Sequence, residues 1–394
     1  MRTYADNSAP RRYVGSYNPP RPTRSPSRRR APRPPARRRD PIWAKMCLIL
    51  GALVMVASGT VVVLPKVLAG WATSEIPMED LLPPELAVEI DGAINILLLG
   101  LDERAGSDSL IRTDTMIIVH IPASHDQVYM VSLPRDAEVD IPDFPASNFK
   151  GWRTKINAAY AFGNQTKDGK PDRTPAGRGR GVQLVAQTIN KVVPGGLRFN
   201  AVAIINFVGF KRILEVIGGV HMCIDERTTS IHYDKNNKYH TKVENISQRK
   251  VYEEGCQDLA PWEALDFARQ RYNVTGADYG RQKHQQQLLM AIFKKLTSKG
   301  VLTNPGKLIE LQKAAGDLLT LDLGKTSLEN WIFTLKGVKS DAVTMIKTNG
   351  GVPNSAGNGN ELFSETSMEL LQAVHDDTVF EFLVKHPSWI AAEK

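Results

Sequence analysis

Short apolar runs alternate with longer amphipathic stretches along most of the chain beyond residue 90. In the longer stretches apolar residues recur every three or four positions, the spacing of one helix face. Apolar strands interleaved with helices favour a sheet covered on both faces, so the pattern predicts an α/β fold, a single α/β/α sandwich domain with a central mixed sheet. The expected strands are Asn95–Asp102, Thr115–Pro122, Gln127–Pro134, Phe199–Asn206 and Val343–Thr348, and the expected helices are Val182–Val192, Phe207–Ile217, Asp278–Leu296, Leu308–Leu319 and Glu365–Val374.

One apolar run is long enough to cross a membrane. Met46–Leu64 contains nineteen residues without a charged side chain, and at about 1.5 Å per residue this nearly spans a hydrocarbon layer of about 30 Å. A cleaved signal peptide is the alternative, but its apolar region would be roughly 7–15 residues long and would end at a small-residue cleavage site. The run is longer than that, so we expect one transmembrane helix.

The net charge of +8 is concentrated ahead of this run. Residues 1–42 hold twelve arginines against Asp6 and Asp40, a charge of +10, so residues 43–394 carry −2. The same segment has nine prolines and few large aliphatic residues, which predicts a disordered tail and no folded nucleic-acid-binding domain. By the positive-inside rule the tail is expected in the cytoplasm and the chain after about Lys66 outside it. The arginines also favour contact with anionic membrane lipid, an arginine-rich docking segment being the alternative.

The expected organisation is a single-pass protein of the cell membrane. About 300 residues follow the apolar run, which is enough for one large domain or two small ones, and no internal repeat is visible. The expected parts are a cytoplasmic tail (1–42), a transmembrane helix (43–66), a stalk (67–90) and a folded domain (91–390).

Two of the three cysteines lie in the exported part. Cys223 and Cys256 bracket a polar segment with few core residues, and an oxidising compartment favours their pairing. A disulfide closing that loop would stabilise the domain by roughly 3–4 kcal/mol. Two buried free thiols are the alternative.

Common catalytic signatures are missing from the sequence. There is no GxxxxGK[ST], HExxH, GxSxG or CxxC motif. The glycine-rich runs at Gly177–Gly181 and Gly350–Asn360 are weak signals of anion-binding turns, because isolated turns of this kind are common. The chemistry is therefore sought among charged residues at the ends of strands and helices.

Charged residues gather where the expected strands end or begin. Asp102 ends one strand and Asp114 opens the next, so both carboxylates are expected at one sheet edge. One or two carboxylates completed by phosphate oxygens are a typical ligand set for Mg²⁺. Arg112 and Arg135 lie beside these ends, where ligand sites of open α/β sheets lie, and they favour an anion bridged by metal. Capping of turns is the alternative role of the two aspartates.

The stretch Phe267–Leu289, FARQRYNVTGADYGRQKHQQQLL, places arginines ahead of an apolar helix. The apolar stripe of that helix, extended backward by threes and fours, reaches Gln285, Arg281 and Asp278, so these polar residues are expected to point inward. A buried arginine needs a partner, and its planar guanidinium suits carboxylate or phosphate. The helix N-terminus also favours an anion. A phosphate site and an internal Arg281–Asp278 ion pair both fit the pattern.

Six motifs follow one another along the chain: NILLLGLD, RTDTMIIV, SLPRD (Ser132–Asp136), KINAAYAFG (Lys155–Gly163), NFVGFKRILEVIGGV (Asn206–Val220) and FARQR followed by DYGRQKHQQQ. Over roughly Asn95–Leu296 the chain thereby resembles the LytR-CpsA-Psr family of cell-wall glycopolymer transferases. The resemblance implies a cytoplasmic N-terminus, one membrane helix and an extracytoplasmic α/β/α domain. It also implies an enzyme that moves a glycopolymer phosphate from a polyprenyl-pyrophosphate carrier to a sugar hydroxyl of peptidoglycan, with Mg²⁺ (or Mn²⁺).

Carried over residue by residue, the resemblance assigns roles to the charged residues. It implies that Asp102 and Asp114 hold the metal, that Arg112 and Arg135 act with Asp114 in catalysis, and that Asp114 is a candidate acceptor for the hydroxyl proton. Two positions depart from the family: His284 stands where an arginine is often found, and Val139 replaces an arginine sometimes found after SLPRD, which puts secondary phosphate contacts in doubt. The implied pyrophosphate-binding residues are Arg135, Lys155, Arg269, Arg271, Asp278, Arg281 and Gln285.

A polyprenyl chain requires an elongated apolar cavity that reaches the arginines. Two stripes of the sequence are candidate walls, although ordinary core packing is the alternative for each residue. The expected partners are a polyprenyl-pyrophosphate-linked glycan, peptidoglycan and membrane lipid; a polyprenyl-pyrophosphate hydrolase and a lipid-sensing membrane regulator are the alternative functions. The candidate wall residues are Phe207, Phe210, Leu214, Leu289, Ile292 and Phe293.

Overall fold

The computed structural model describes residues 79–103, 109–272, 274–298, 316, 319–326, 331 and 342–391. All of them belong to one compact unit, Pro41–Lys394. The expected tail, the expected transmembrane helix and the first part of the stalk lie outside the described residues. Among the helices that are described, none is long and apolar enough to span a membrane.

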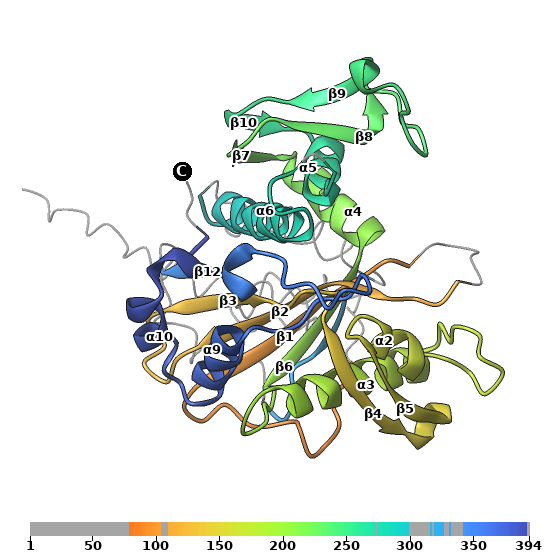
Figure 1. Cartoon of the computed structure of the whole chain (residues 1–394), viewed down its shortest axis with the longest axis vertical. Coiled ribbons are helices and arrows are strands. Elements are labelled where there is room, and N and C mark those ends of the chain that lie inside the picture. Colours follow the sequence, from red (N-terminus) through yellow and green to blue (C-terminus); the bar gives the residue numbers. More distant parts are fainter. Residues whose placement is uncertain are drawn as a thin grey trace, which may run out of the picture. The chain divides into compact units, whose positions relative to one another are not determined.

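A six-stranded mixed sheet forms the centre of the described unit (Figure 1). Its strands are β1 (Ile94–Leu101), β2 (Thr113–Ile121), β3 (Val128–Ser132), β6 (Ala201–Asn206), β11 (Leu319–Asp322) and β12 (Val343–Lys347). They lie in the order β11-β6-β1-β2-β3-β12. The β1–β2, β2–β3 and β6–β11 pairs are antiparallel, whereas β1–β6 and β3–β12 are parallel. The predicted α/β fold with a central mixed sheet is confirmed.

The strand directions bring several chain segments to one edge of the sheet. Leu101 at the end of β1 pairs with Thr113 at the start of β2 and with Asn206 at the end of β6. Ser132 at the end of β3 pairs with Lys347 at the end of β12. The residues that follow β1 and β3 therefore lie at the edge where β2 begins, as the sequence predicted for its charged residues.

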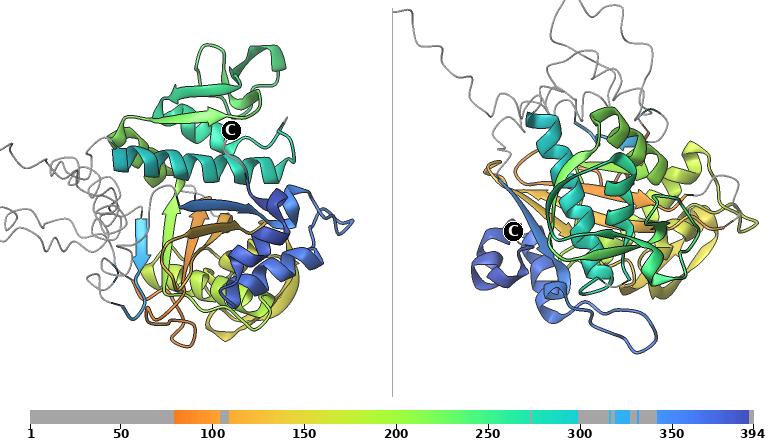
Figure 2. Two further views of the ribbon diagram at one scale, coloured as in Figure 1. Left: turned by 90° about the vertical axis from the view of Figure 1, so that its left-hand side faces the viewer. Right: turned by 90° about the horizontal axis from the view of Figure 1, so that it is seen from above.

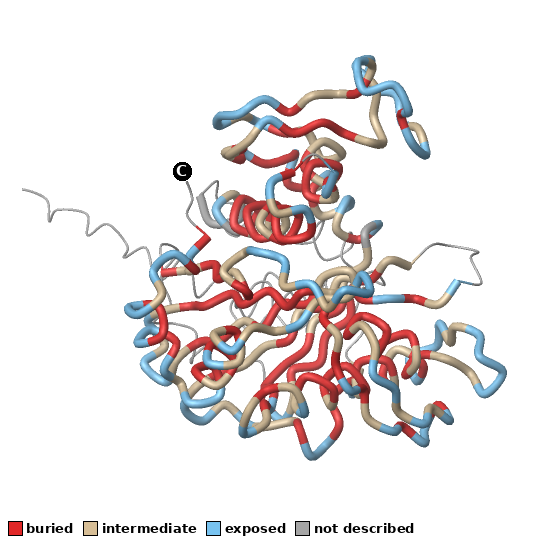
Figure 3. The backbone as a smooth tube through the Cα atoms, viewed as in Figure 1, coloured by how far each residue is buried: buried red, intermediate tan, exposed pale blue. Residues whose placement is uncertain are grey.

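Helices cover both faces of the sheet. One face packs against α2 (Ala158–Gly163), α3 (Pro175–Val192), α9 (Glu365–His375) and α10 (Val379–Lys385). The other face receives Leu289 from α6 (Asp278–Ser298), which packs with Ile117 and Met130. Figure 3 shows the strands largely buried between these layers, which is why their sequences are apolar on both faces.

A second lobe packs on the outer side of α6. It consists of α4 (Phe207–Ile217), α5 (Pro261–Arg269), the strand pair β7 (Val220–Ile224) and β10 (Gly255–Leu259), and the pair β8 (Thr228–Asp234) and β9 (Arg249–Tyr252). Helix α6 lies between this lobe and the sheet in both Figure 1 and Figure 2. Gln286 on one side donates to Ser132 Oγ over 2.8 Å, and Lys295 on the other donates to Gly218 O over 2.9 Å. Polar contacts thus fasten α6 in both directions.

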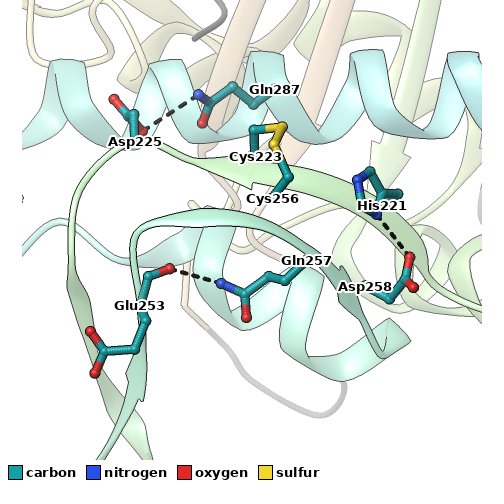
Figure 4. Close-up of a disulfide and its surroundings, with 8 residues drawn as sticks. All are labelled: His221, Cys223, Asp225, Glu253, Cys256, Gln257, Asp258 and Gln287. Carbon is teal, nitrogen blue, oxygen red and sulfur yellow. Dashed lines mark hydrogen bonds and ion pairs between the residues drawn. A yellow bond between two sulfur atoms is a disulfide. The ribbon is translucent and has the colours of Figure 1, made fainter. Parts of the chain in front are cut away.

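A disulfide closes the second lobe. Cys223 on β7 and Cys256 on β10 face each other across the strand pair and are joined through their sulfur atoms (Figure 4). This is the pair that the sequence singled out. The closed loop contains β8 and β9, and Tyr252 of β9 is fully buried, so the polar segment is more structured than its composition indicated.

Three local differences from the sequence prediction have physical causes. Helix α3 begins at Pro175, so the glycines of residues 177–181 are helical and do not form the suggested anion-binding turn. Gly181 lies against the Tyr160 ring, and a Cβ at this position would approach the ring within 2.8 Å. Close helix packing explains the glycine. The predicted Leu308–Leu319 helix is wrong at its end, because Leu319 starts β11; the rest of it lies outside the described residues. The hairpin of β4 (Glu138–Phe144) and β5 (Phe149–Lys155) was missed, since its strands contain few apolar residues.

Candidate functional site

Strand register places Arg135 opposite Asp114. Ile117 of β2 pairs with Ser132 of β3, and the same antiparallel register continued by three residues sets Asp114 against Arg135. Arg135 Nη1 donates to Asp114 Oδ1 over 2.8 Å. Leu101 pairs with Thr113 and Gly100 with Thr115, so Asp114 is the extra residue of a β-bulge, a feature that redirects a side chain at a sheet edge.

Arg135 is the centre of a charged cluster, hereafter the arginine cluster (Asp114, Arg135, Asp136, Asp278 and Arg281). Arg135 Nε lies 3.4 Å from Asp278 Oδ1 and 3.6 Å from Asp136 Oδ2. Arg281 Nη2 donates to the same Asp278 oxygen over 2.7 Å. Burial lowers the pKa of Arg135, but the carboxylates of Asp114, Asp278 and Asp136 outweigh burial and raise it. Burial lowers the pKa of Arg281, which is only 4% exposed.

The two guanidinium groups of the cluster keep unsatisfied donors. Arg135 Nε and Arg281 Nε are both buried and neither has a hydrogen-bond partner. A buried N–H without an acceptor costs free energy, and each such group calls for an explanation. Planar guanidinium groups match phosphate oxygens, so the cluster is suited to an anion that supplies further acceptors.

The first two turns of α6 build one side of the cluster. The sequence predicted that Asp278, Arg281 and Gln285 point inward, and the structure buries the first two and places Gln285 Oε1 2.9 Å from Thr115 Oγ1, which donates to it. Gln282 adds a bond from its Nε2 to Asp278 Oδ2 over 3.2 Å. The Arg281–Asp278 ion pair, which was the alternative to a phosphate site, is therefore present, and the phosphate site stays a prediction.

Lys155 joins the cluster from the end of β5. Its Nζ donates to Asp136 Oδ1 over 2.9 Å. This contact places a third cation near Arg135, because Asp136 also faces Arg135 Nε. The predicted proximity of Arg135, Lys155, Asp278, Arg281 and Gln285 is thus realised in one part of the fold.

The two aspartates assigned to metal lie at the same sheet edge. The Asp102 N–H donates to Arg112 O over 3.1 Å. The segment that follows β1 is therefore paired with the segment just before β2, which carries Asp114. Arg112 itself is exposed. Thr113, which directly precedes Asp114, pairs with Leu101. Its buried hydroxyl has no hydrogen-bond partner. Within the described residues, no group of three or more His, Cys, Asp or Glu side chains is arranged to hold a metal ion by itself.

Arg269 and Arg271 lie at and just beyond the end of α5 in the second lobe. Arg271 is exposed, donates from Nη2 to Tyr272 Oη over 3.0 Å and stacks on that ring with its Cζ 5.0 Å from the ring centre. Arg269 is partly buried. These two arginines lie on a different element from Arg135 and Arg281, and their part in the site stays a prediction.

The residues proposed to wall a lipid cavity divide between two cores. Phe210, Leu214 and Ile292 pack inside the second lobe, whereas Leu289 packs against the central sheet. Leu289 and Ile292 lie on different faces of α6, and each face is covered by a different core. The described members of the two predicted stripes thus pack in two separate cores, which agrees with the alternative of ordinary core packing, and the lipid cavity stays a prediction. The side chains of Phe207 and Phe293 lie outside the described residues.

The two departures from the expected arginines have clear structural roles. His284 is 1% exposed on its side chain and stacks on Phe267 with ring centres 4.0 Å apart. Burial lowers its pKa to about 4, against the opposing effects of Asp225 and Glu226. Val139 is buried in the core beneath the sheet. Neither side chain replaces a phosphate-binding arginine; both serve packing.

Glu361 is a member of the site that the sequence did not indicate. It pairs through its backbone with the segment after Arg135, and its carboxyl group accepts a hydrogen bond from Tyr279. Asn349 supports the same tyrosine by donating from Nδ2 to its hydroxyl over 2.7 Å. The partners are far apart in sequence, so the only local signal was the neighbouring glycine-rich run at residues 350–360.

The chain is similar to known proteins over most of its length. Residues 73–376 match the LytR_cpsA_psr family. A relative from Oceanobacillus iheyensis, polyisoprenyl-teichoic acid–peptidoglycan teichoic acid transferase TagU, is 28% identical over 77% of this chain and 84% of its own length. The protein of the same name from Bacillus cereus is 30% identical over 60% of this chain and 64% of its own length. The crystal structure of protein gbs0355 from Streptococcus agalactiae shares the fold, with a TM-score of 0.54 at 19% identity over 73% of this chain and 88% of that one.

Proposed function

The chain belongs to the LytR_cpsA_psr family, and from this premise we propose that it is a transferase that joins a glycopolymer to peptidoglycan. The donor is a polyprenyl-pyrophosphate-linked glycan, and the acceptor is a sugar hydroxyl of peptidoglycan. Two relatives carry names for this type of transfer with teichoic acid. The observation that carries the proposal is the pair Arg281, which is buried, and Arg135, which is 15% exposed, each with a buried Nε atom that makes no hydrogen bond.

The arginine cluster is suited to bind and polarise a pyrophosphate. Arg281, which is buried, and Arg135, which is partly buried, supply fixed positive charge where electrostatic stabilisation is stronger than in water. Asp114, Asp136 and Asp278 hold the two guanidinium groups in position before the donor arrives. Charge that develops on the leaving polyprenyl phosphate then meets donors that need no reorganisation.

We propose that Asp102 and Asp114 hold Mg²⁺ or Mn²⁺ when the donor is bound. Two carboxylates at one sheet edge fit such an ion when phosphate oxygens complete its ligands. The ion would neutralise phosphate charge and act as a Lewis acid. Arg112, exposed beside Asp114, is placed to contact the outer part of the substrate.

The proposed cellular setting follows from the sequence. The arginine-rich tail lies in the cytoplasm, residues 43–66 cross the cell membrane, and the domain described above faces outward. This arrangement places the arginine cluster on the side where peptidoglycan is built. The phosphoanhydride bond of the donor supplies the driving force, so no nucleotide is required outside the cytoplasm.

The test is a transfer assay with the full-length chain in detergent. A donor with a labelled glycan is mixed with peptidoglycan fragments, and Arg135→Ala is compared with Arg153→Ala, a control whose half-exposed guanidinium pairs with Glu138 and Asp140. We expect label on peptidoglycan with the unmodified chain and the control. Arg135→Ala should bind the donor roughly ten- to a hundredfold more weakly, because a charge-assisted contact is lost.

The products separate the competing functions. Polyprenyl phosphate released without label on peptidoglycan would show a hydrolase. Donor binding without any turnover would point to a lipid-sensing regulator. Either result would overturn the transferase proposal.

A further inference from the structure

Glu361 reaches the arginine cluster through backbone pairing. Its N–H donates to Asp136 O over 2.9 Å, and the Glu138 N–H donates to Glu361 O over 2.7 Å. Ala137 and Glu361 form a parallel β-bridge. Because Asp136 directly follows Arg135, this pairing fixes the backbone of Glu361 beside the proposed pyrophosphate site.

The carboxyl group of Glu361 is held on one side only. Tyr279, the second residue of α6, donates a hydrogen bond from its hydroxyl group to this carboxyl group and accepts a hydrogen bond from Asn349 Nδ2. The remaining oxygen, Glu361 Oε2, is buried and has no hydrogen-bond partner. An oriented carboxyl group with a free, desolvated oxygen has the form of a proton acceptor whose partner is supplied by substrate.

The surroundings of Glu361 favour the protonated form. Burial raises its pKa, and the nearby carboxylates of Asp278 and Asp136 raise it further, whereas the bond from Tyr279 and the charge of Lys155 lower it; the net effect is a raised pKa. A carboxylate that binds a proton more readily is a better base near neutral pH. Among the described residues, these four are the groups with the largest effect on the Glu361 pKa.

We infer that Glu361 accepts the proton of the attacking acceptor hydroxyl, an inference that rests on the proposed transferase function. The hydroxyl oxygen forms a bond to the glycan-bearing phosphorus while the bond from that phosphorus to the bridging oxygen breaks. Polyprenyl phosphate leaves with the electron pair, and the hydroxyl proton passes to Glu361 Oε2 and later to solvent. Asp114 is less suited, because it holds Arg135 and is assigned to the metal.

The experiment compares Glu361→Gln with Glu138→Gln in the full-length chain. Glu138 lies on the same paired segment, and its side chain accepts bonds from Asn358, Asn360 and Arg153 away from the cluster. We expect Glu361→Gln to lower kcat by about a hundredfold or more, the usual range for loss of a general base, with unchanged donor KM and thermal melting. The control should keep its rate.

The pH profile separates a proton acceptor from a merely structural residue. The unmodified chain should lose kcat as pH falls through the pKa of Glu361, and this acidic limb should disappear in Glu361→Gln. Tyr279→Phe removes the bond that lowers the Glu361 pKa, so it should shift the limb to higher pH. Added formate should restore part of the rate to Glu361→Ala.

Two results would sink the inference in distinguishable ways. If the unmodified chain transfers glycan and Glu361→Gln does so with the same rate and pH profile, Glu361 is not the proton acceptor, but the proposed function stands. If the unmodified chain forms no linkage to peptidoglycan, the proposed function fails and the inference fails with it.

Discussion

The two guanidinium groups of the arginine cluster find their carboxylate partners in different ways, Arg135 from distant parts of the chain and Arg281 from its own helix. Arg135 contacts Asp114 through strand register and Asp278 through α6 packing, while Arg281 uses Asp278 within its own helix. The sequence identified Asp278 and Arg281 because polar residues continued an apolar helix stripe. It identified Asp114 and Arg135 because they lie at the ends of predicted strands. It did not show which carboxylate pairs with which arginine, since that depends on the position of α6 over the sheet.

The Arg281–Asp278 pair should behave as a buried ion pair. Arg281→Ala removes one partner from side chains that are 5% and 12% exposed. Asp278 keeps its longer contacts to Arg135 and Gln282, so the unfolding free energy should fall toward the lower end of the about 3–5 kcal/mol that is typical of a broken buried ion pair. The double variant with Asp278→Ala should lose less than the sum of the single losses. Urea unfolding of the four proteins measures this, and strict additivity would contradict the pair.

Substitutions of the proposed metal ligands and of the arginines should have different effects on donor binding. Asp114→Asn removes one proposed metal ligand, so it should abolish transfer while donor binding and the thermal melt persist. Arg269→Ala or Arg271→Ala should instead weaken donor binding roughly ten- to a hundredfold together with the rate. Full activity in chelator, or transfer by Asp114→Asn, would leave Asp102 and Asp114 as structural turn residues.

Secondary structure followed the sequence most closely where apolar periodicity was strong. Helix α4 begins and ends at the predicted residues, and β1 differs from the prediction by one residue at each end. The β4–β5 hairpin escaped prediction because its pairing is set by partners such as α3 and residue Glu361 rather than by its own composition. Helix α3 was predicted too short because buried glycines, which are poor helix formers, occupy its first turns.

The contact between α5 and α6 should make stability depend on pH through His284. Its pKa in the folded chain is about 4, below the value of about 6.5 expected when unfolded. As pH falls from 6.5 to 4 the unfolded chain binds a proton that the folded chain resists, so the unfolding free energy should fall by up to about 1.4 kcal/mol per pH unit.

The test compares denaturant unfolding of His284→Phe and the unmodified chain between pH 4.5 and 7.5. Phenylalanine keeps an aromatic ring against Phe267 but cannot take up a proton, so the difference between the two slopes reports His284. The exposed His221 provides a matched control as His221→Phe. Equal slopes for His284→Phe and the unmodified chain would contradict the assigned pKa.

The disulfide should contribute strongly to the unfolding free energy of the second lobe. Cys223 and Cys256 close a loop with a sequence separation of 33, and opening it should lower the unfolding free energy by roughly 3–4 kcal/mol, chiefly through the unfolded chain. Cys223→Ser with Cys256→Ser, measured by urea unfolding, tests the size of the effect. Non-reducing mass analysis that found two free thiols would contradict the pairing.

In the whole molecule, the net positive charge and the proposed catalytic residues lie in different parts of the chain. The residues assigned to the proposed site run from Asp102 to Glu361, whereas the net positive charge lies in residues 1–42. Sequence analysis recovered the fold and the strand-end residues, because both follow from local patterns. Glu361 escaped it because its place depends on a contact between the segment after β3 and the segment before α9.

If the first 66 residues only anchor and orient the enzyme, deleting them should spare the chemistry. The variant that begins at residue 67 keeps every residue of the proposed site, so it should transfer glycan from a short-chain, detergent-soluble donor at the rate of the full chain. It should lose activity on a long-chain donor in anionic vesicles, because the span and the basic tail no longer hold it at the surface. A shortened chain that binds the soluble donor but cannot transfer would show that the anchor segment takes part in catalysis.

In intact cells, added protease should remove the outward domain and leave a membrane-protected N-terminal fragment. Digestion only after lysis would contradict the proposed orientation.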